Sequence, residues 1–177
     1  MESQKVRAKL KDLLDLLDDS FDPVLEAVAR WDRRLLEAIQ ESRYLRKCYW
    51  GFRLATRVGD GYLWGLVGLF VLLFGGSNDK YYVFIALAIT GVNMAIYMSL
   101  KRTFRRGRPS YELVRRRSYR FIGRYSFPSG HTASSFSIAF LIAHFYPMLT
   151  FQVLAYTAAS LIGFSRIYLG EHYPSDV

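Results

Sequence analysis

Four long stretches of this 177-residue chain contain no Lys, Arg, Asp or Glu, and short polar segments separate them. They cover about residues 61–76, 81–100, 131–146 and 148–165. A helix needs about 20 apolar residues to cross roughly 30 Å of hydrocarbon. The second stretch is long enough to do so, and the shorter stretches would need flanking residues to complete a span. Four such stretches are too many for a soluble domain of this length. The pattern therefore predicts an all-α fold, a multi-pass bundle of transmembrane helices.

Residues 1–57 have a different pattern, in which charged and apolar side chains alternate at helical spacing. Asp22 and Pro23 suit the N-cap and the first position of a helix, so they separate two predicted helices. The apolar positions are Leu10, Leu13, Leu14, Leu17 and Phe21 in the first helix, and Val24, Val28, Trp31, Leu35 and Ile39 in the second. The alternatives are a soluble hairpin and a pair of interfacial helices, and the adjoining spans favour the second. We therefore divide the chain into N-terminal amphipathic helices (1–57) and a transmembrane domain (58–177).

Composition excludes several classes of protein. The charged share of 22% and the aromatic share of 16% exclude a disordered chain. The single cysteine, Cys48, excludes a disulfide framework and a cysteine zinc site. The net charge of +9 indicates an anionic partner: nucleic acid, phospholipid headgroups or a phosphorylated substrate. Residues 101–128 contain 10 Lys or Arg and one acidic residue, Glu112, so the whole excess lies in this segment.

Three polar clusters flank the predicted spans. The first runs from Lys101 to Pro109, the second is Pro128-Ser129-Gly130-His131, and the third is Ser165-Arg166 followed by His172 and Asp176. Tight turns are predicted at 77–80 and 146–148. The chain would therefore cross the membrane twice before the first cluster, and twice more between the second cluster and the third. All three clusters are thus expected on one membrane face, which predicts a single shared site.

The residue types in these clusters suit a phosphoryl group. Lys101, Arg108 and Arg166 would supply fixed positive charge and forked donors for phosphate oxygens. Ser129 and Gly130 precede a predicted helix, whose free N–H groups and dipole favour an anion.

Two histidines, His131 and His172, complete the set. Cleavage of a phosphate ester through a covalent intermediate needs one group to attack phosphorus and another to protonate the leaving oxygen. Asp176 lies four residues after His172, close enough to accept a hydrogen bond from one ring nitrogen and to orient the other.

With these residues in place, the sequence resembles the type 2 phosphatidic acid phosphatase family of membrane lipid phosphate phosphatases. The signature of that family is Lys-x6-Arg-Pro, Pro-Ser-Gly-His and Ser-Arg-x5-His-x3-Asp, and all three parts are intact here between Lys101 and Asp176. The resemblance implies that His172 is the nucleophile that becomes phosphohistidine, that His131 is the general acid and that Asp176 orients His172. It also implies phosphate binding by Lys101, Arg108, Ser129, Gly130 and Arg166.

The resemblance further implies a reaction without metal or other cofactor. The sequence agrees, with 3 histidines and no carboxylate cluster near the site to hold magnesium. Arg102, Arg105 and Arg106 are interpreted as headgroup anchors at a span end. The run 115–117, three arginines, is interpreted as binding anionic lipid headgroups rather than nucleic acid. His144 is expected to be structural.

The chain departs from the family pattern at Val177, one residue after the orienting aspartate. In the family, this aspartate begins a further transmembrane helix that closes the bundle. We therefore expect the chain to be a truncated form of a longer protein, or a partner to supply the closing helix. Asp176 is expected at a frayed terminus, where it would not hold His172 rigidly.

The function expected is that of a lipid phosphate or lipid diphosphate phosphatase, whose partners are the bilayer and a phosphorylated lipid rather than nucleic acid. Phosphatidic acid, phosphatidylglycerol phosphate, polyprenyl phosphates or diphosphates and phosphorylated lipid A all fit, because these residues contact the phosphate and not the tail. A lipid phosphotransferase and a catalytically silent lipid-binding protein are the alternatives. The N-terminus and the site are expected on one face of the cell membrane, which the positive-inside rule makes cytoplasmic.

Overall fold

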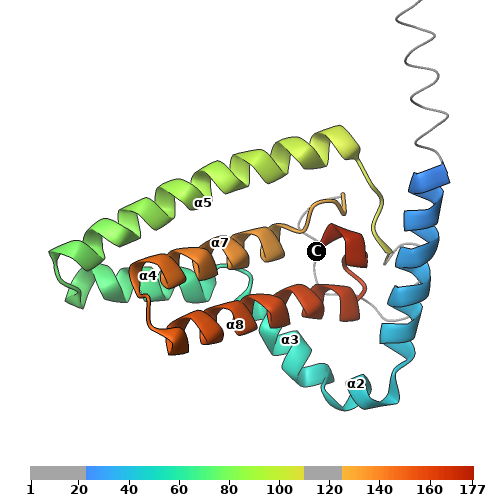
Figure 1. Cartoon of the computed structure of the whole chain (residues 1–177), viewed down its shortest axis with the longest axis horizontal. Helices are drawn as coiled ribbons and strands as arrows, with labels where there is room; N and C mark the ends of the chain where they lie inside the picture. The colour runs from blue at the N-terminus through green and yellow to red at the C-terminus, as the bar shows by residue number, and fades with distance from the viewer. Residues whose placement is uncertain (1–22, 110–124) are drawn as a thin grey trace, which may run out of the picture.

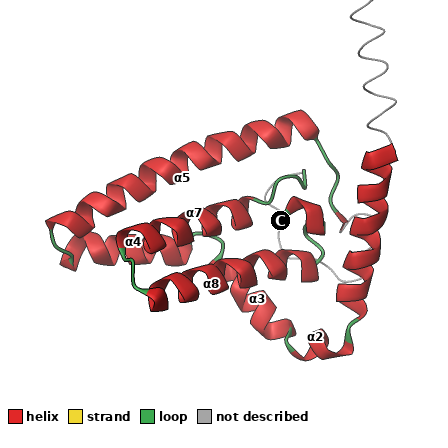
Figure 2. Cartoon of the chain, in the orientation of Figure 1, coloured by secondary structure: helices red, strands yellow, loops and turns green. Residues whose placement is uncertain are grey.

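The computed structural model describes residues 23–109 and 125–177, and within these ranges it contains helices and no strand (Figure 2). The helices are a helix over 23–41, α2 (Arg43–Lys47), α3 (Tyr49–Val58), α4 (Tyr62–Phe74), α5 (Ser77–Phe104), α7 (Gly130–Phe145), α8 (Leu149–Tyr168) and the 3₁₀ helix η1 (Pro174–Asp176). The all-α expectation is confirmed. The helix expected over 10–21, its boundary at Asp22 and the arginines of 115–117 lie outside the described residues.

The long helices form one bundle. α7 packs against both α5 and α8, α3 lies along α8, and α4 packs against α5. Figure 1 shows the helix over 23–41 standing across one end of this bundle, next to the C-terminus of the chain. The last turn of α5, the first turn of α7 and the last turn of α8 all meet at that end.

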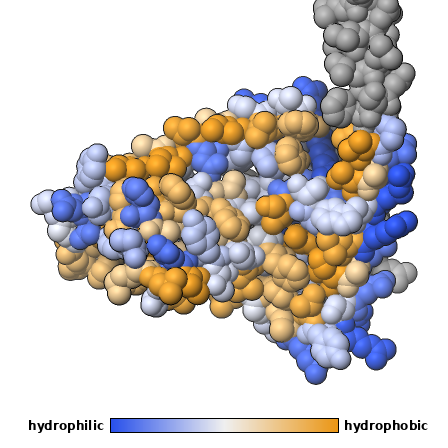
Figure 3. Space-filling model, in the orientation of Figure 1, coloured by the Kyte–Doolittle hydropathy of each residue, from blue (hydrophilic) through white to orange (hydrophobic). Residues whose placement is uncertain are grey.

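Much of the bundle surface is apolar. Phe70 and Phe74 of α4 and Phe84 and Leu87 of α5 are each more than half exposed, and Figure 3 shows hydrophobic surface over much of the visible face. Exposed apolar side chains at this density suit contact with hydrocarbon. Within the described residues, α5 is the one helix long and apolar enough to cross a membrane, and the apolar part of α4 is shorter. Spans at α4, α7 and α8 stay predictions.

The helix over 23–41 contacts the bundle through a narrow face. Leu36 is fully buried and packs with Ile167 and Tyr173, and Ile39 lies against this cluster. The earlier part of the predicted apolar stripe faces outward, with Trp31 52% exposed. This helix therefore docks onto the C-terminal segment through its second half and leaves the first half of the stripe open to its surroundings.

Candidate active site

The three polar clusters meet in a cavity of about 880 Å³ between α4, α5, α7 and α8. Its lining includes six of the predicted site residues: Lys101, Arg108, Gly130, His131, Arg166 and His172. Ser129 and Asp176 are buried behind this lining and are not part of it. Residues far apart in the sequence are thus brought together at one end of the bundle.

A buried carboxylate holds the two arginines. Glu171 is 3% exposed, and its Oε2 lies 2.5 Å from Nη2 of Arg166 and 3.5 Å from Nη1 of Arg108. Arg166 also donates from Nη1 to the hydroxyl of Thr56 at 2.5 Å. Paired guanidinium groups keep a fixed orientation, which a phosphate-binding site needs. Lys101 approaches the same cavity from α5 and donates to the carbonyl oxygen of Tyr125 at 3.2 Å.

Ser129 serves the local structure of α7. Its hydroxyl oxygen accepts from the backbone N–H of Thr132 at 3.4 Å and from the Thr132 hydroxyl at 2.9 Å, so it is the N-cap of this helix. Its own backbone N–H donates to the carbonyl oxygen of Asp176 at 2.9 Å. Gly130, the first residue of α7, lines the cavity instead. The helix N-terminus is therefore presented to the cavity from Gly130 onward.

His172 and Asp176 form a buried pair. His172 is 1% exposed, and its Nδ1 lies 3.7 Å from Oδ2 of Asp176, longer than a hydrogen bond. Asp176 accepts from the Ser126 hydroxyl, from Nη1 of Arg106 at 2.7 Å and from the backbone N–H of Tyr173 at 2.8 Å. The expectation of a frayed Asp176 is wrong, because these donors fix the carboxylate from three directions.

The expectation that Arg106 is a headgroup anchor is wrong. Its Nη2 lies 2.5 Å from Oδ2 of Asp32, which is fully buried in the helix over 23–41. Asp32 also accepts from the backbone N–H of Ser175 at 2.9 Å and from its hydroxyl at 2.6 Å. Arg106 thus joins the N-terminal helix to Asp176. This role was not predictable from the sequence, because the partner of Arg106 lies 74 residues away.

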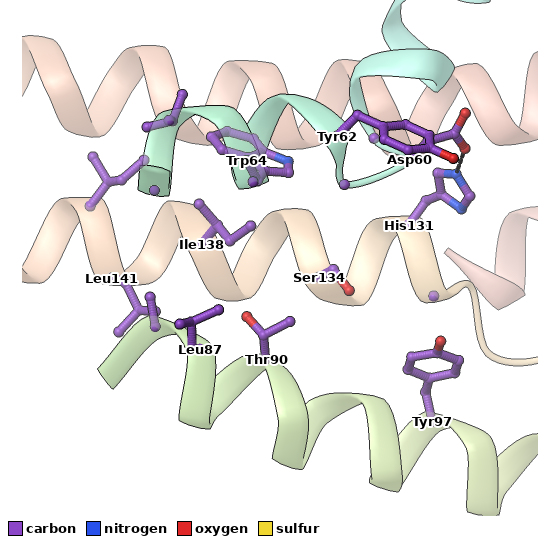
Figure 4. Close-up of a pocket in the computed structure, with 18 of the residues that line it drawn as sticks. Asp60, Tyr62, Trp64, Leu87, Thr90, Tyr97, His131, Ser134, Ile138 and Leu141 are labelled. Atoms are coloured by element: carbon purple, nitrogen blue, oxygen red, sulfur yellow. Dashed lines mark hydrogen bonds and ion pairs between the residues drawn. The ribbon is translucent and has the colours of Figure 1, made fainter. Parts of the chain in front are cut away.

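His131 has an acidic partner that was not predicted either. Its Nε2 lies 2.6 Å from Oδ1 of Asp60, in the turn between α3 and α4 (Figure 4). Both side chains are partly exposed, at 20% for His131 and 25% for Asp60. Asp60 was within reach of sequence reasoning, because it directly precedes the first uncharged stretch and thus lies at the predicted site face. Glu171 carries no such signal beyond its place next to His172.

The surroundings of His172 and Asp176 set their charges. Burial lowers the pKa of His172 to about 3, and the positive charges of Arg166 and Arg108 act in the same direction. Burial opposes ionisation of Asp176, but His172, the Ser126 hydroxyl and Arg106 hold the pKa of its carboxyl below the ordinary value. At neutral pH, His172 is therefore a neutral imidazole beside an ionised carboxylate, the state in which a histidine can act as a nucleophile.

This buried neutral histidine predicts a loss of stability in mild acid. In the unfolded chain a histidine titrates near pH 6.5, whereas folded His172 stays neutral down to about pH 3. Below pH 6.5 the unfolded state binds the extra proton, so stability falls as the pH falls. The decrease due to His172 is expected to reach about 2 kcal/mol at pH 5. Asp176 contributes only below about pH 4, where an unfolded aspartate begins to take up its proton.

Thermal unfolding of the detergent-solubilised protein at pH 7, 6 and 5 measures this effect. His172→Asn removes the titrating group, so its unfolding temperature should depend less on pH than that of the wild type. Parallel pH dependences for the two proteins would contradict the prediction.

The described residues contain no group of three or more His, Cys, Asp or Glu side chains arranged to hold a metal ion. Two acidic side chains of the cavity pair with basic groups, Glu171 with Arg166 and Asp60 with His131. The polar end of this cavity therefore combines cationic groups, two imidazoles and a helix N-terminus, a set suited to binding and cleaving a phosphate ester.

Solved structures of two proteins resemble this fold. Aquifex aeolicus LpxE superposes with a TM-score of 0.68 at 30% sequence identity, over 81% of this chain and 84% of that chain. A transmembrane PAP2 type phosphatidylglycerolphosphate phosphatase from Bacillus subtilis superposes with a TM-score of 0.64 at 23% identity, over 96% of this chain and 86% of that chain. At that lower identity the second likeness concerns the fold alone.

Sequence comparison gives the family. Phosphatidylglycerophosphatase B of Bacillus subtilis (strain 168) is 33% identical over 101 residues, which cover 51% of this chain and 47% of that protein. The match therefore spans about half the length of this curated relative. The family model described as the PAP2 superfamily matches residues 82–177, more than half of the chain and all three signature clusters. This chain belongs to the PAP2 superfamily.

Proposed function

We propose that this protein is an integral-membrane phosphatase that removes phosphate from a lipid phosphate or lipid diphosphate, without a metal ion and through a phosphohistidine. One observation carries the proposal: the cavity that holds the catalytic histidines continues into an apolar groove. Trp64 and Val67 of α4, Leu87 of α5 and Ile138 and Leu141 of α7 line this groove. Figure 4 shows Trp64, Ile138, Leu87 and Leu141 of this groove at increasing distance along the helices from His131. A phosphate headgroup with a hydrocarbon tail fits such a cavity.

The charged end would hold the phosphate. Lys101, Arg108 and Arg166 come from three segments and face the same space, and the N-terminus of α7 adds its dipole at Gly130. These donors would also stabilise the additional negative charge of the transition state. Ser129 would contribute through the cap that shapes this helix end.

The two histidines would divide the chemistry. Neutral His172 attacks phosphorus, so that an N–P bond forms while the P–O bond to the lipid breaks. His131 gives its proton to the departing lipid oxygen. In the second half, His131 takes a proton from water, whose oxygen attacks phosphorus and releases His172. Asp176, held by Arg106 and Ser126, keeps the His172 ring in its attacking orientation.

The substrate class is supported by the relative found by sequence comparison, which is named phosphatidylglycerophosphatase B. Phosphatidylglycerol phosphate is therefore the first lipid to test. The active-site face is proposed to be cytoplasmic, because residues 1–57 and 101–124 contain 12 and 10 Lys or Arg, whereas the opposite loop has Lys80.

Phosphate release from a panel of lipids in EDTA tests the proposal. The panel contains phosphatidylglycerol phosphate, phosphatidic acid, a polyprenyl diphosphate and phosphorylated lipid A, each in mixed micelles with the purified protein. We expect release from at least one lipid at full rate in EDTA. Release that requires added magnesium would refute the metal-free mechanism, and no release from any lipid would refute the phosphatase. Transfer to an added acceptor lipid without free phosphate would favour the phosphotransferase.

A further inference from the structure

The turn between α3 and α4 packs closely against His131. Gly59 ends α3, and a Cβ atom there would lie 2.7 Å from Cγ2 of Ile162 and 3.0 Å from Cδ2 of His131. Gly61 begins α4 with a φ of 91°, in the left-handed region that side chains other than glycine avoid. The two glycines therefore permit a close approach and a sharp change of direction. Asp60 lies between them, with its carboxylate 2.6 Å from the His131 ring.

From this geometry we infer that Asp60 is the positioning residue of His131, holding its ring and stabilising its protonated form for proton donation to the leaving lipid. The inference rests on the proposed function, in which His131 is the general acid. An ionised aspartate only accepts hydrogen bonds, so the Nε2 atom that faces it carries a proton. The second proton of the imidazolium, on Nδ1, is then the one available for transfer.

The charges around His131 explain why such a partner is needed. Arg166 of α8 and Arg108 of the segment after α5 line the same cavity as His131, and their positive charges repel a protonated imidazole. Lys101 lines the same cavity from α5. The Asp60 carboxylate, 2.6 Å from the ring, favours its charged form. Without Asp60, these cations would favour a neutral ring, which has no proton to donate.

Each of the two histidines has an aspartate beside it, and the two pairs differ in the distance between carboxylate and ring. Asp176 lies 3.7 Å from a His172 ring that must stay neutral, and Arg106 shares its charge. Asp60 lies 2.6 Å from a ring that must be charged. A carboxylate in direct contact favours the imidazolium more strongly than one at a longer distance.

Asp60→Asn tests the inference, because it preserves the size of the side chain and removes its charge. For a lipid phosphate, we expect kcat at neutral pH to fall about 10- to 100-fold. The basic limb of the kcat/KM profile should move about one to two pH units lower. With p-nitrophenyl phosphate, whose leaving group needs little protonation, the loss should stay under about tenfold.

Asp60→Glu, which retains the charge, should restore part of the lipid rate. Glu26→Gln, at an exposed surface carboxylate, is the matched control and should leave all values unchanged.

A double variant separates positioning from a general structural effect. Asp60 acts through His131, so Asp60→Asn added to His131→Gln should lower the lipid rate by less than about twofold more. A wild-type profile for Asp60→Asn would overturn the inference. Equal losses of kcat on the lipid phosphate and on p-nitrophenyl phosphate, with the basic limb of the kcat/KM profile unchanged, would also overturn it. A purely structural role of Asp60 predicts that result. Absence of activity in the wild type on every lipid would instead refute the proposed function itself.

Discussion

Replacing His172 by alanine is expected to lower phosphate release by at least about a thousandfold, the largest effect of any single change in this chain. In a covalent mechanism the nucleophile provides the whole route to product, so its loss leaves only the residual catalysis of the binding site. His172 lines the cavity, and the alanine side chain that replaces it has no atom that can attack phosphorus.

The phosphoenzyme provides a direct measurement. After incubation with a ³²P-labelled lipid phosphate and rapid denaturation at high pH, the wild type should retain label as phosphohistidine, and His172→Ala should retain none. His131→Gln should accumulate label from p-nitrophenyl phosphate, because that leaving group departs without its acid while the second step still needs a base. His144→Ala, at an exposed histidine that stacks on Phe140, is the matched control. Labelling of His172→Ala at the wild-type level would identify another nucleophile.

The main helices were predictable from the sequence because a membrane helix must be long and uncharged. The stretches of about 61–76 and 81–100 contain α4 and most of α5, whose bounds are Tyr62–Phe74 and Ser77–Phe104. α5 extends one turn beyond its apolar stretch, which carries Lys101 to the cavity. Six predicted site residues line the cavity. They were predictable for a different reason, because the spacing of charged and small residues in the signature is specific to the family.

The residues that support the site could not be predicted in this way. Glu171 and Thr56 orient Arg166, but single acidic and hydroxyl residues near span ends have no distinguishing pattern. Arg106 was interpreted as a headgroup anchor because arginines at span ends usually are. Its actual partner, Asp32, depends on how a separate amphipathic helix docks. Such long-range pairing is set by packing in three dimensions, and a single sequence records the residues without the pairing.

The ion pair between Asp32 and Arg106 joins the helix over 23–41 to the active-site end of the bundle, so removing it tests the fold strongly. Asp32 is 0% exposed, and its partners are Nη2 of Arg106 and both the N–H and the hydroxyl of Ser175. Asp32→Ala leaves Arg106 with one carboxylate and removes the acceptor of two further donors. Removing one member of a buried pair typically costs 3–5 kcal/mol. Because the Arg106 side chain is 27% exposed, we expect a loss of unfolding free energy of about 3 kcal/mol.

Activity should fall together with stability, because the same arginine fixes Asp176 behind His172. When Asp32 is absent, Arg106 loses one of its two carboxylate partners and holds Asp176 less firmly, so kcat should decrease about tenfold with little change in KM. Thermal unfolding and lipid phosphate turnover measure the two effects.

Glu37→Ala removes a carboxylate from the exposed face of the same helix and should change stability by less than about 0.5 kcal/mol. In a double-mutant cycle with Arg106→Ala, a coupling energy above about 1 kcal/mol is expected. Additive losses would show that the N-terminal helix and the site are energetically independent, so the helix would then serve only as an attachment to the bundle surface.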